Sequence, residues 1–233
     1  MPGSPWYATT VVGIAAETAR AKTFRLQLPE ATEFLAGQHV VVRLTAPDGY
    51  TAQRSYSVAS APDGGDQLEL TVERLEDGEV STFLHDVVEV GDELEVRGPL
   101  GGFFVWDGAT PALLVGGGSG IVPLMSMLRL ARRTGRTDLV RLVVSARSPH
   151  ELFYGPELPG PEATILYTRH APAGWPRAAA RLMAADIPPL EELGDVTAFV
   201  CGSTGFCNTA GDLLVAIGQP VDRIKVERFG PSG

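Results

Sequence analysis

The sequence predicts two joined domains, an antiparallel β-barrel followed by an α/β domain with a parallel sheet. Apolar and polar residues alternate with a period of two as far as about residue 105, and beyond Trp106 apolar runs alternate with helical segments. The first pattern is typical of strands with one buried face, and the second of βαβ units. At 233 residues the chain has room for both domains. We place the barrel at residues 1–106 and the α/β domain at residues 107–233.

The barrel is predicted from short alternating segments separated by turn signals. The alternation is clearest at residues 21–28, 38–44 and 67–72, and turn residues stand at 47–49 (PDG), 62–65 (PDGG) and 77–78 (DG). About six short strands with such spacing predict a small closed barrel. One short helix is expected within it, at residues 81–86.

The α/β domain is predicted from buried strands at 111–115, 139–144 and 197–200 and helices at 123–133 and 209–217. Its first strand runs into the glycine turn at 116–120 (GGGSG). Glycines at such a turn let the backbone approach a pyrophosphate, and the amides of the following helix point at the anion. The spacing is G-x-G-x-x-P, with Pro123 in the first helical turn, and departs from the usual dinucleotide fingerprint. A tight turn without a ligand is the alternative.

Composition excludes several classes of protein. The net charge is −9, and the excess of acid lies in the first domain, with 7 basic and 16 acidic residues up to Val105. Such a chain lacks the basic face that a duplex nucleic-acid binder needs. Two cysteines, Cys201 and Cys207, provide neither a disulfide framework nor a four-cysteine iron–sulfur cluster, and we expect no resident metal. The chain opens without a signal-peptide pattern and its one long uncharged run is broken by glycines and prolines, so we expect a cytoplasmic protein with no membrane partner.

A second group of residues lies in the barrel half. In the segment 54–57 (RSYS), strand alternation puts Arg54 and Tyr56 on one face, and this pair suits a flat, anionic ligand. Together with its surroundings the segment resembles the ferredoxin–NADP reductase-like superfamily of FAD- and NAD(P)H-dependent flavoprotein reductases. The matching motifs occur in the family's order and span nearly the whole chain: 54–57 (RSYS), 78–81 (GEVS), 98–103 (GPLGGF), 118–123 (GSGIVP), 201–202 (CG) and 227–230 (ERFG).

The resemblance implies that the barrel binds a flavin. Arg54 would bind the flavin diphosphate, Tyr56 would pack on the isoalloxazine ring, and Ser57 would lie near the ring nitrogen that accepts hydride. The turn at 78–81 resembles the FAD version of the motif, so FAD is favoured over FMN; a plain helix N-cap is the alternative role for Ser81. The implied flavin-binding residues are Arg54, Ser55, Tyr56, Ser57, Val72, Glu73, Gly78, Val80 and Ser81.

The resemblance also implies that the α/β domain binds NAD(P)H. Ser57, Cys201 and Phe229 would meet at the reacting rings, with Cys201 against the nicotinamide and Phe229 covering the flavin. The alternatives are a buried structural cysteine and ordinary packing of the last strand. The implied nucleotide-binding residues are Gly117, Gly118, Ser119, Gly120, Ile121, Pro123, Ser145, Arg147, Arg169, Arg177, Cys201, Gly202 and Phe229.

NADPH is favoured over NADH because the segment after the second parallel strand carries arginine and no acid. Arg147, Arg169 and Arg177 are candidates for the 2′-phosphate, and the alternative is that each is solvated at the surface. The electrons would leave for a separate acceptor, ferredoxin or an oxygenase component, although an acidic barrel disfavours a large footprint for an acidic ferredoxin. The alternatives are a reductase of free flavin, ferric chelates or another small acceptor, and an electron-transfer subunit without turnover of its own.

Overall fold

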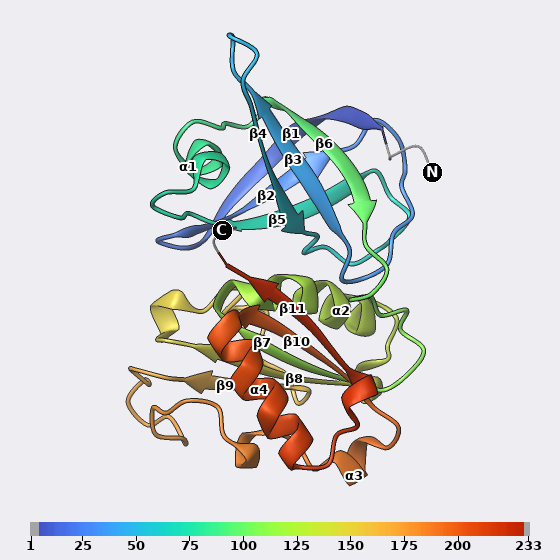
Figure 1. Cartoon of the computed structure of the whole chain (residues 1–233), viewed down its shortest axis with the longest axis vertical. Coiled ribbons are helices and arrows are strands. Elements are labelled where there is room, and N and C mark those ends of the chain that lie inside the picture. Colours follow the sequence, from blue (N-terminus) through green and yellow to red (C-terminus); the bar gives the residue numbers. More distant parts are fainter. Residues whose placement is uncertain (1–4, 231–233) are drawn as a thin grey trace.

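The computed structural model describes residues 5–230 and consists of two stacked units (Figure 1). The first unit is an antiparallel sheet with one helix, and the second is a parallel sheet flanked by helices, so the predicted fold class is confirmed. The elements of the first unit are β1 (Trp6–Thr18), β2 (Ala21–Gln27), β3 (His39–Thr45), β4 (Thr51–Ser57), β5 (Gln67–Glu73), α1 (Glu79–Asp86) and β6 (Glu93–Leu100).

The antiparallel sheet curls into a barrel that remains open between its two edge strands. Its order is β4-β3-β6-β1-β2-β5, and among the described residues β4 and β5 meet only past the end of β4, at the Val58–Leu70 bridge. The predicted closure of the barrel is therefore wrong. Helix α1 covers the gap, because its buried residues Val80 and Leu84 belong to the apolar core of the barrel.

The second unit is a five-stranded parallel sheet of order β11-β10-β7-β8-β9. Successive residues of β7 face opposite sides, with Leu114 in the cluster under α2 and Leu113 in the cluster under α4, so the sheet is covered on both faces. Its strands and α-helices are β7 (Ala112–Gly117), α2 (Ile121–Arg133), β8 (Val140–Ala146), β9 (Ala163–Tyr167), α3 (Leu190–Leu193), β10 (Thr197–Ser203), α4 (Thr204–Ala216) and β11 (Ile224–Phe229). Short 3-10 helices lie at Gly118–Gly120, Thr137–Leu139, Pro149–Glu151, Ala184–Asp186 and Val221–Arg223.

Helix α2 lies between the parallel sheet and the barrel, so the two units share one apolar seam (Figure 1). The cluster of buried residues around α2 also includes Ala21, Ala36 and Ala59 of the barrel. Trp106 spans the junction: its backbone bridges to Ala36, and its indole is buried in the α2 cluster. The predicted boundary at 106/107 falls in this connection and stays a prediction, and its outer ends, 1–4 and 231–233, lie outside the described residues.

No helix within residues 5–230 has the length and apolar composition needed to cross a membrane.

One close approach fixes how α2 meets the neighbouring strand. A Cβ on Gly120 would lie 2.2 Å from the carbonyl oxygen of Cys201 and 2.5 Å from the amide nitrogen of Gly202. Both neighbours are backbone atoms that no side-chain rotation can move. Glycine at 120 is thus required by the contact between the start of α2 and the end of β10.

Replacing Gly120 with alanine is expected to destabilise the protein by roughly 1–3 kcal/mol, because the added carbon overpacks a backbone contact. The matched control is Gly211→Ala in the middle of α4, where a Cβ meets nothing within 4 Å. That change should stabilise the protein by about 0.5–1 kcal/mol, since alanine is the better helix former. Urea unfolding of the three proteins checks both values. A Gly120→Ala variant as stable as the parent would contradict the packing of α2 on β10.

Candidate functional site

The first part of the candidate site is the face of β4 that carries Arg54 and Tyr56. Tyr56 packs half-buried against the barrel core, opposite Val40 on β3, while Arg54 is exposed. The Arg54 Nη1 donates to the carbonyl oxygen of Gln53 at 2.8 Å, which leaves most of its donors for a ligand. Burial raises the pKa of the Tyr56 phenol, and the nearby charge of Arg54 opposes the rise. The structure therefore brings a cation and an aromatic ring together on one face, as predicted.

The first turn of α1 approaches this face. The hydroxyl of Tyr50, just before β4, donates to Glu79 Oε2 at 3.0 Å and takes up the one acidic side chain of that turn. Amides in a first helical turn have no acceptor within the helix, and the helix dipole is positive there. Arg54 and these amides form a donor set that suits a diphosphate, so the residues present fit the diphosphate of a flavin nucleotide.

Ser81 has a different place from the one expected. Its Oγ donates to the carbonyl oxygen of Gly78 at 3.0 Å and accepts from the amide of Leu75 at 3.2 Å. A Cβ on Gly78 would lie 2.3 Å from that oxygen, which explains the glycine. The N-cap of α1 is Gly78, and no side chain makes a capping hydrogen bond there. The alternative of Ser81 as the N-cap is therefore wrong. Ser81 holds the turn in shape, and the turn presents its amides.

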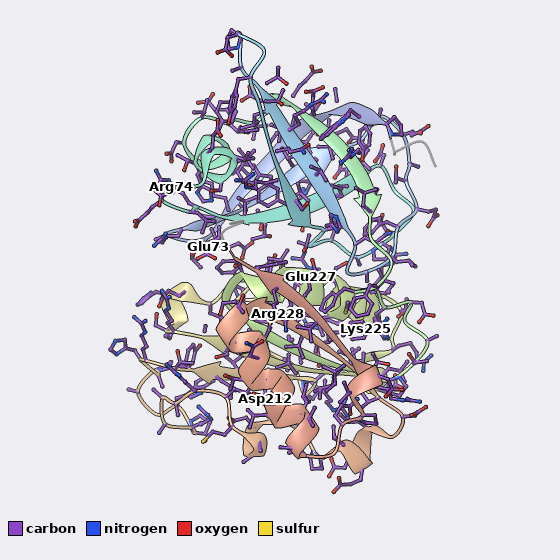
Figure 2. The ribbon with its side chains drawn as sticks, viewed as in Figure 1. Glu73, Arg74, Asp212, Lys225, Glu227 and Arg228 are labelled. Atoms are coloured by element: carbon purple, nitrogen blue, oxygen red, sulfur yellow. The ribbon has the colours of Figure 1, made fainter. Side chains whose placement is uncertain are left out.

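Two more residues of the predicted flavin set face inward. The side chains of Val72 and Val80 are each 1% exposed and lie in the barrel core. The carbonyl oxygen of Val72 is also taken, since His85 Nε2 lies 2.9 Å from it. These side chains cannot touch a ligand without unpacking the core, so any part they have in binding falls to the backbone. Glu73, the next residue on β5, is half-buried and faces the seam (Figure 2).

An open groove of about 920 Å³ adjoins the first turn of α1 and continues between α1 and the β3–β4 hairpin. Its floor is apolar, with Leu44, Ala52 and Leu94, and Gly78 and Glu79 stand at its wall. Ligand sites commonly have volumes of roughly 300–1,000 Å³. The groove offers room for a group attached to an anion at the α1 turn.

The glycine turn forms the second part of the candidate site. Strand order reverses between β7 and β10, and ligands of parallel α/β sheets bind at the carboxyl ends of strands at such a switch point. Gly118 has φ +57° and open space where a Cβ would stand. A Cβ on Gly117 or on Gly202 would lie 2.7 or 2.8 Å from the ring of Phe206, so both glycines are needed for the two loops to converge. The result is a cradle of bare backbone, which fits a nucleotide pyrophosphate.

Not all of the predicted turn residues face this cradle. Ile121 and Pro123 are buried residues of α2 beneath the cradle, and Ile121 belongs to the apolar cluster around that helix. Ser119 is half-buried at the rim of the cradle. Ile121 and Pro123 thus fix the helix that presents the turn.

The three residues predicted to meet at the reacting rings differ in access. Ser57 is 5% exposed and Cys201 is wholly buried in the α2 cluster, while Phe229 is half-buried and packs on that cluster. Burial raises the pKa of the Cys201 thiol, and the charge of Glu227 adds to the rise. The buried position fits the alternative of a structural cysteine. Contact between Cys201 and a nucleotide requires a covering side chain to move.

The predicted phosphate-binding arginines separate into two groups. The Arg169 amide donates to the carbonyl oxygen of Arg147 at 3.0 Å, so these two exposed residues lie on adjoining loops beyond β8 and β9, with Ser145 buried at the end of β8. Arg177 instead uses all its donor atoms within the protein: Nε and Nη2 bind Asp186, and Nη1 and Nη2 bind three carbonyl oxygens. Arg177 has no donor left for a phosphate and braces its own loop.

Glu227 belongs to the matching motif at 227–230, but the sequence analysis gave it no role of its own. It pairs in register with Cys201 across β10 and β11, and alternation along β11 puts it on the same face as Phe229, toward the seam (Figure 2). Burial raises the pKa of the Glu227 carboxyl group. The alternating segment 224–229 (IKVERF) could have indicated Glu227, because it places this acidic residue on the same strand face as Phe229.

Comparisons with known proteins agree with this arrangement. Residues 9–105 match the family described as the oxidoreductase FAD-binding domain, and residues 114–212 match the oxidoreductase NAD-binding domain. The chain is 32% identical over 238 residues to the glycine betaine monooxygenase reductase subunit of Chromohalobacter salexigens, covering 94% of this chain and 63% of that protein. It is 30% identical to the 3-ketosteroid-9-alpha-monooxygenase ferredoxin reductase component of Mycolicibacterium smegmatis, covering 97% of this chain and 66% of that protein.

The fold also matches a solved structure. The flavohem-like FAD/NAD binding domain of nitric oxide dioxygenase from Vibrio cholerae superposes with a TM-score of 0.80 at 23% identity, covering 98% of this chain and 99% of that chain. The chain spans 63% and 66% of the lengths of the two reductase components.

Replacing Glu227 with glutamine is expected to raise the melting temperature at about pH 8 and to change it little at about pH 4.5. The folded protein holds the Glu227 pKa above its ordinary value, so its ionisation costs stability as the pH rises through that folded-state pKa. Melting curves across this pH range check the effect. Glu192→Gln, at an exposed position of α3, is the control. A gain that is equal at both pH values would contradict the role of burial.

Proposed function

The chain belongs to the ferredoxin–NADP reductase-like superfamily of flavoprotein reductases, and from this premise we propose that it takes hydride from NADPH onto a bound FAD and passes the electrons to an oxygenase component or ferredoxin. The observation that carries the proposal is a pair of backbone cradles, one in each unit. One lies at the first turn of α1 beside Arg54, and the other at the glycine turn before α2. Each fits a diphosphate, and each belongs to a different cofactor domain.

The residues of this chain bind and orient in the proposed reaction. Arg54 and the α1 amides hold the flavin diphosphate, Tyr56 supports the ring, and Phe229 covers the face that the nicotinamide approaches. A bound flavin supplies the conversion between two-electron hydride transfer and one-electron release. Ser57 and Glu227 lie on the two sides of the seam, where Ser57 offers a hydroxyl and Glu227 a carboxyl group of raised pKa.

FAD is favoured over FMN by the groove beside α1. A diphosphate at the first turn of the helix places the rest of an FAD molecule, its adenosine, next to this apolar-floored space of about 920 Å³. FMN ends at its phosphate and would leave the groove unused.

NADPH is favoured over NADH by two exposed arginines, Arg147 and Arg169, on adjoining loops. Arg169 has no side-chain hydrogen bond to any described residue, and Arg147 has one long contact with Glu151 at 3.4 Å. Both guanidinium groups are therefore available for a 2′-phosphate.

An oxygenase component is favoured as the acceptor because both relatives reported above are reductase components of monooxygenases. The acidic barrel also disfavours a broad contact with an acidic partner.

Anaerobic titration of the purified, flavin-loaded protein with NADPH and with NADH tests the proposal. Loss of the visible flavin absorbance on adding one equivalent of nucleotide supports it, and the nucleotide that acts at lower concentration identifies the donor. A protein that binds flavin but is reduced by neither nucleotide would leave only the electron-transfer subunit without turnover. Reduction followed by fast turnover with free flavin alone would favour the small-acceptor alternative.

Arg54→Ala is expected to weaken FAD binding about 10- to 100-fold, because hydrogen bonds to charged groups contribute roughly 1.5–3 kcal/mol. Quenching of flavin fluorescence during titration of the flavin-free protein gives the dissociation constant. Arg20→Ala, at another exposed position of the barrel, is the matched control. Equal affinity in the two variants would remove Arg54 from the site.

Arg169→Ala is expected to raise KM for NADPH about 10-fold and to leave KM for NADH nearly unchanged, since one charge-assisted contact to the 2′-phosphate is lost. Steady-state assays with ferricyanide as acceptor measure both constants. Arg133→Ala, at the exposed end of α2, controls for general loss of positive charge. An unchanged KM for NADPH would contradict the proposed phosphate contact.

A further inference from the structure

Helix α2 connects the nucleotide turn directly to the strand that carries Tyr56. The helix begins at Ile121, immediately after the glycine turn, and its middle contacts the segment that follows β4. The Ser126 hydroxyl donates to the carbonyl oxygen of Ser60 at 2.6 Å, and Arg129 Nη1 donates to the carbonyl oxygen of Ala59 at 3.0 Å. Ala59 lies two residues beyond Ser57. One helix therefore links the glycine turn to the segment that follows β4.

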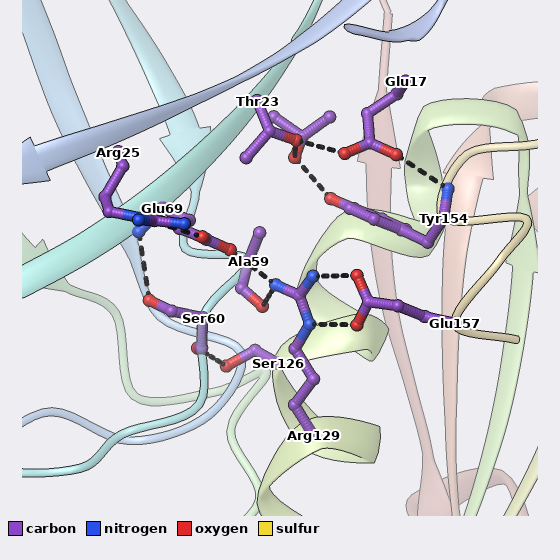
Figure 3. Close-up of polar contacts among 11 residues, drawn as sticks. Glu17, Thr23, Arg25, Ala59, Ser60, Glu69, Ser126, Arg129, Tyr154 and Glu157 are labelled. Atoms are coloured by element: carbon purple, nitrogen blue, oxygen red, sulfur yellow. Dashed lines mark hydrogen bonds and ion pairs between the residues drawn. The ribbon is translucent and has the colours of Figure 1, made fainter. Parts of the chain in front are cut away.

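Arg129 also binds carboxylates on both sides of the seam (Figure 3). Its Nη1 donates to Glu69 Oε2 of β5 at 2.8 Å, and its Nε donates to Glu157 Oε2 of the α/β domain at 2.9 Å. The Arg129 side chain is only 19% exposed. Burial alone would lower the pKa of this guanidinium, but the hydrogen bond and charge of Glu157 and the charge of Glu69 outweigh it and raise the pKa. We call Arg129 with Ala59, Glu69 and Glu157 the Arg129 bridge.

A second set of hydrogen bonds crosses the seam beside the bridge. The Tyr154 hydroxyl donates to Thr71 Oγ1 of β5, which lies 2.7 Å from Thr23 Oγ1 of β2, and Thr23 donates to Glu17 at 2.7 Å. The other oxygen of Glu17 accepts from the Tyr154 amide at 3.0 Å and closes the circuit. Tyr154 is buried at φ +56°, a conformation that persists in a non-glycine residue only where the surroundings fix it.

The apolar part of the seam cannot by itself fix the register of one unit against the other. The barrel contributes the small side chains Ala21, Ala36 and Ala59 to the cluster around α2. Apolar contact is non-directional, so a surface of methyl groups permits sliding of one domain over the other. The guanidinium of Arg129 has planar, directional donors and permits one register.

We propose that Arg129 is a positioning residue, which holds the nucleotide turn on α2 in register with β4 and so sets how the nicotinamide meets the flavin ring. The inference rests on the proposed function. Transfer between two bound rings depends steeply on their separation and alignment, and a misplacement of about 1 Å can cost roughly 100-fold in rate. Arg129 needs no contact with either ring, because it acts through α2 and the segment after β4.

The test compares Arg129→Ala with Arg132→Ala. Arg132 lies one turn further along α2 and binds Glu162 at 2.7 Å and the backbone carbonyl oxygen of Glu157, so its contacts stay within the α/β domain. Anaerobic stopped-flow mixing of the flavin-loaded proteins with NADPH gives the limiting rate of flavin reduction and the dissociation constant separately. Arg129→Ala should lower the limiting rate about 10- to 100-fold, while the dissociation constant for NADPH stays within about twofold of the parent value. Arg132→Ala should match the parent protein.

Two further readouts separate positioning from mere stability. The long-wavelength charge-transfer absorbance of the nicotinamide–flavin pair should be weaker in Arg129→Ala than in the parent protein. Adding guanidinium ion to the variant should restore both this absorbance and the limiting rate of flavin reduction. Glu69→Gln removes only the barrel-side carboxylate of the Arg129 bridge and should lower the limiting rate by a smaller factor. If Arg129→Ala does not fold, the rate of Glu69→Gln tests the positioning role of the bridge.

The inference is overturned if the variants that fold, Arg129→Ala and Glu69→Gln, reduce flavin at the parent rate, or if Arg132→Ala is slowed as much as Arg129→Ala. A parent protein that no nucleotide reduces would instead overturn the proposed function, so the two failures are distinguishable.

Discussion

The placement of helix α2 is the constraint on which the rest of the structure depends. The helix covers one face of the parallel sheet, presents the glycine turn at its amino end and lies against the barrel along its length. These three demands explain its composition. Its start needs glycine at 120 to approach β10, its middle is apolar on nearly every side, and its polar residues Ser126 and Arg129 bind carbonyl groups of the barrel. Any shift of α2 would move the glycine turn relative to the barrel.

Electrostatics divides the two units by task. The barrel carries most of the acidic residues, and Glu76, Asp77 and Glu79 line the groove beside its candidate diphosphate site. The groups there that favour an anion are Arg54, which has donors left, and the amides in the first turn of α1. In the second unit an anion would be met by backbone amides at the glycine turn, which need no net positive charge.

Periodicity was sufficient to predict the two sheets and the order of the elements, because these depend on local rules. Glycine placement indicated the candidate cradle before α2, while the one at residues 78–81 came from the family resemblance. What failed depended on side-chain and strand contacts that neither the periodicity nor the motifs encode. The opening of the barrel follows from where β5 meets residue 58, and the commitment of Arg177 follows from Asp186 and three carbonyl groups. Ser81 was assigned from its motif, while its hydroxyl in fact completes the turn at 75–78. Arg129 had no signal at all, since its partners Glu69 and Glu157 lie 60 and 28 residues away.

The junction at Trp106 affects how the two units unfold. Because its indole is buried in the α2 cluster while its backbone pairs with Ala36, the barrel cannot loosen without exposing part of the core of the other unit. Two domains with independent cores would unfold in two steps. Here the barrel has an apolar core of its own, but the cluster around α2 also holds residues of the barrel and so couples the unfolding of the two units. A cut between the two units would expose an indole and an apolar helix face to water.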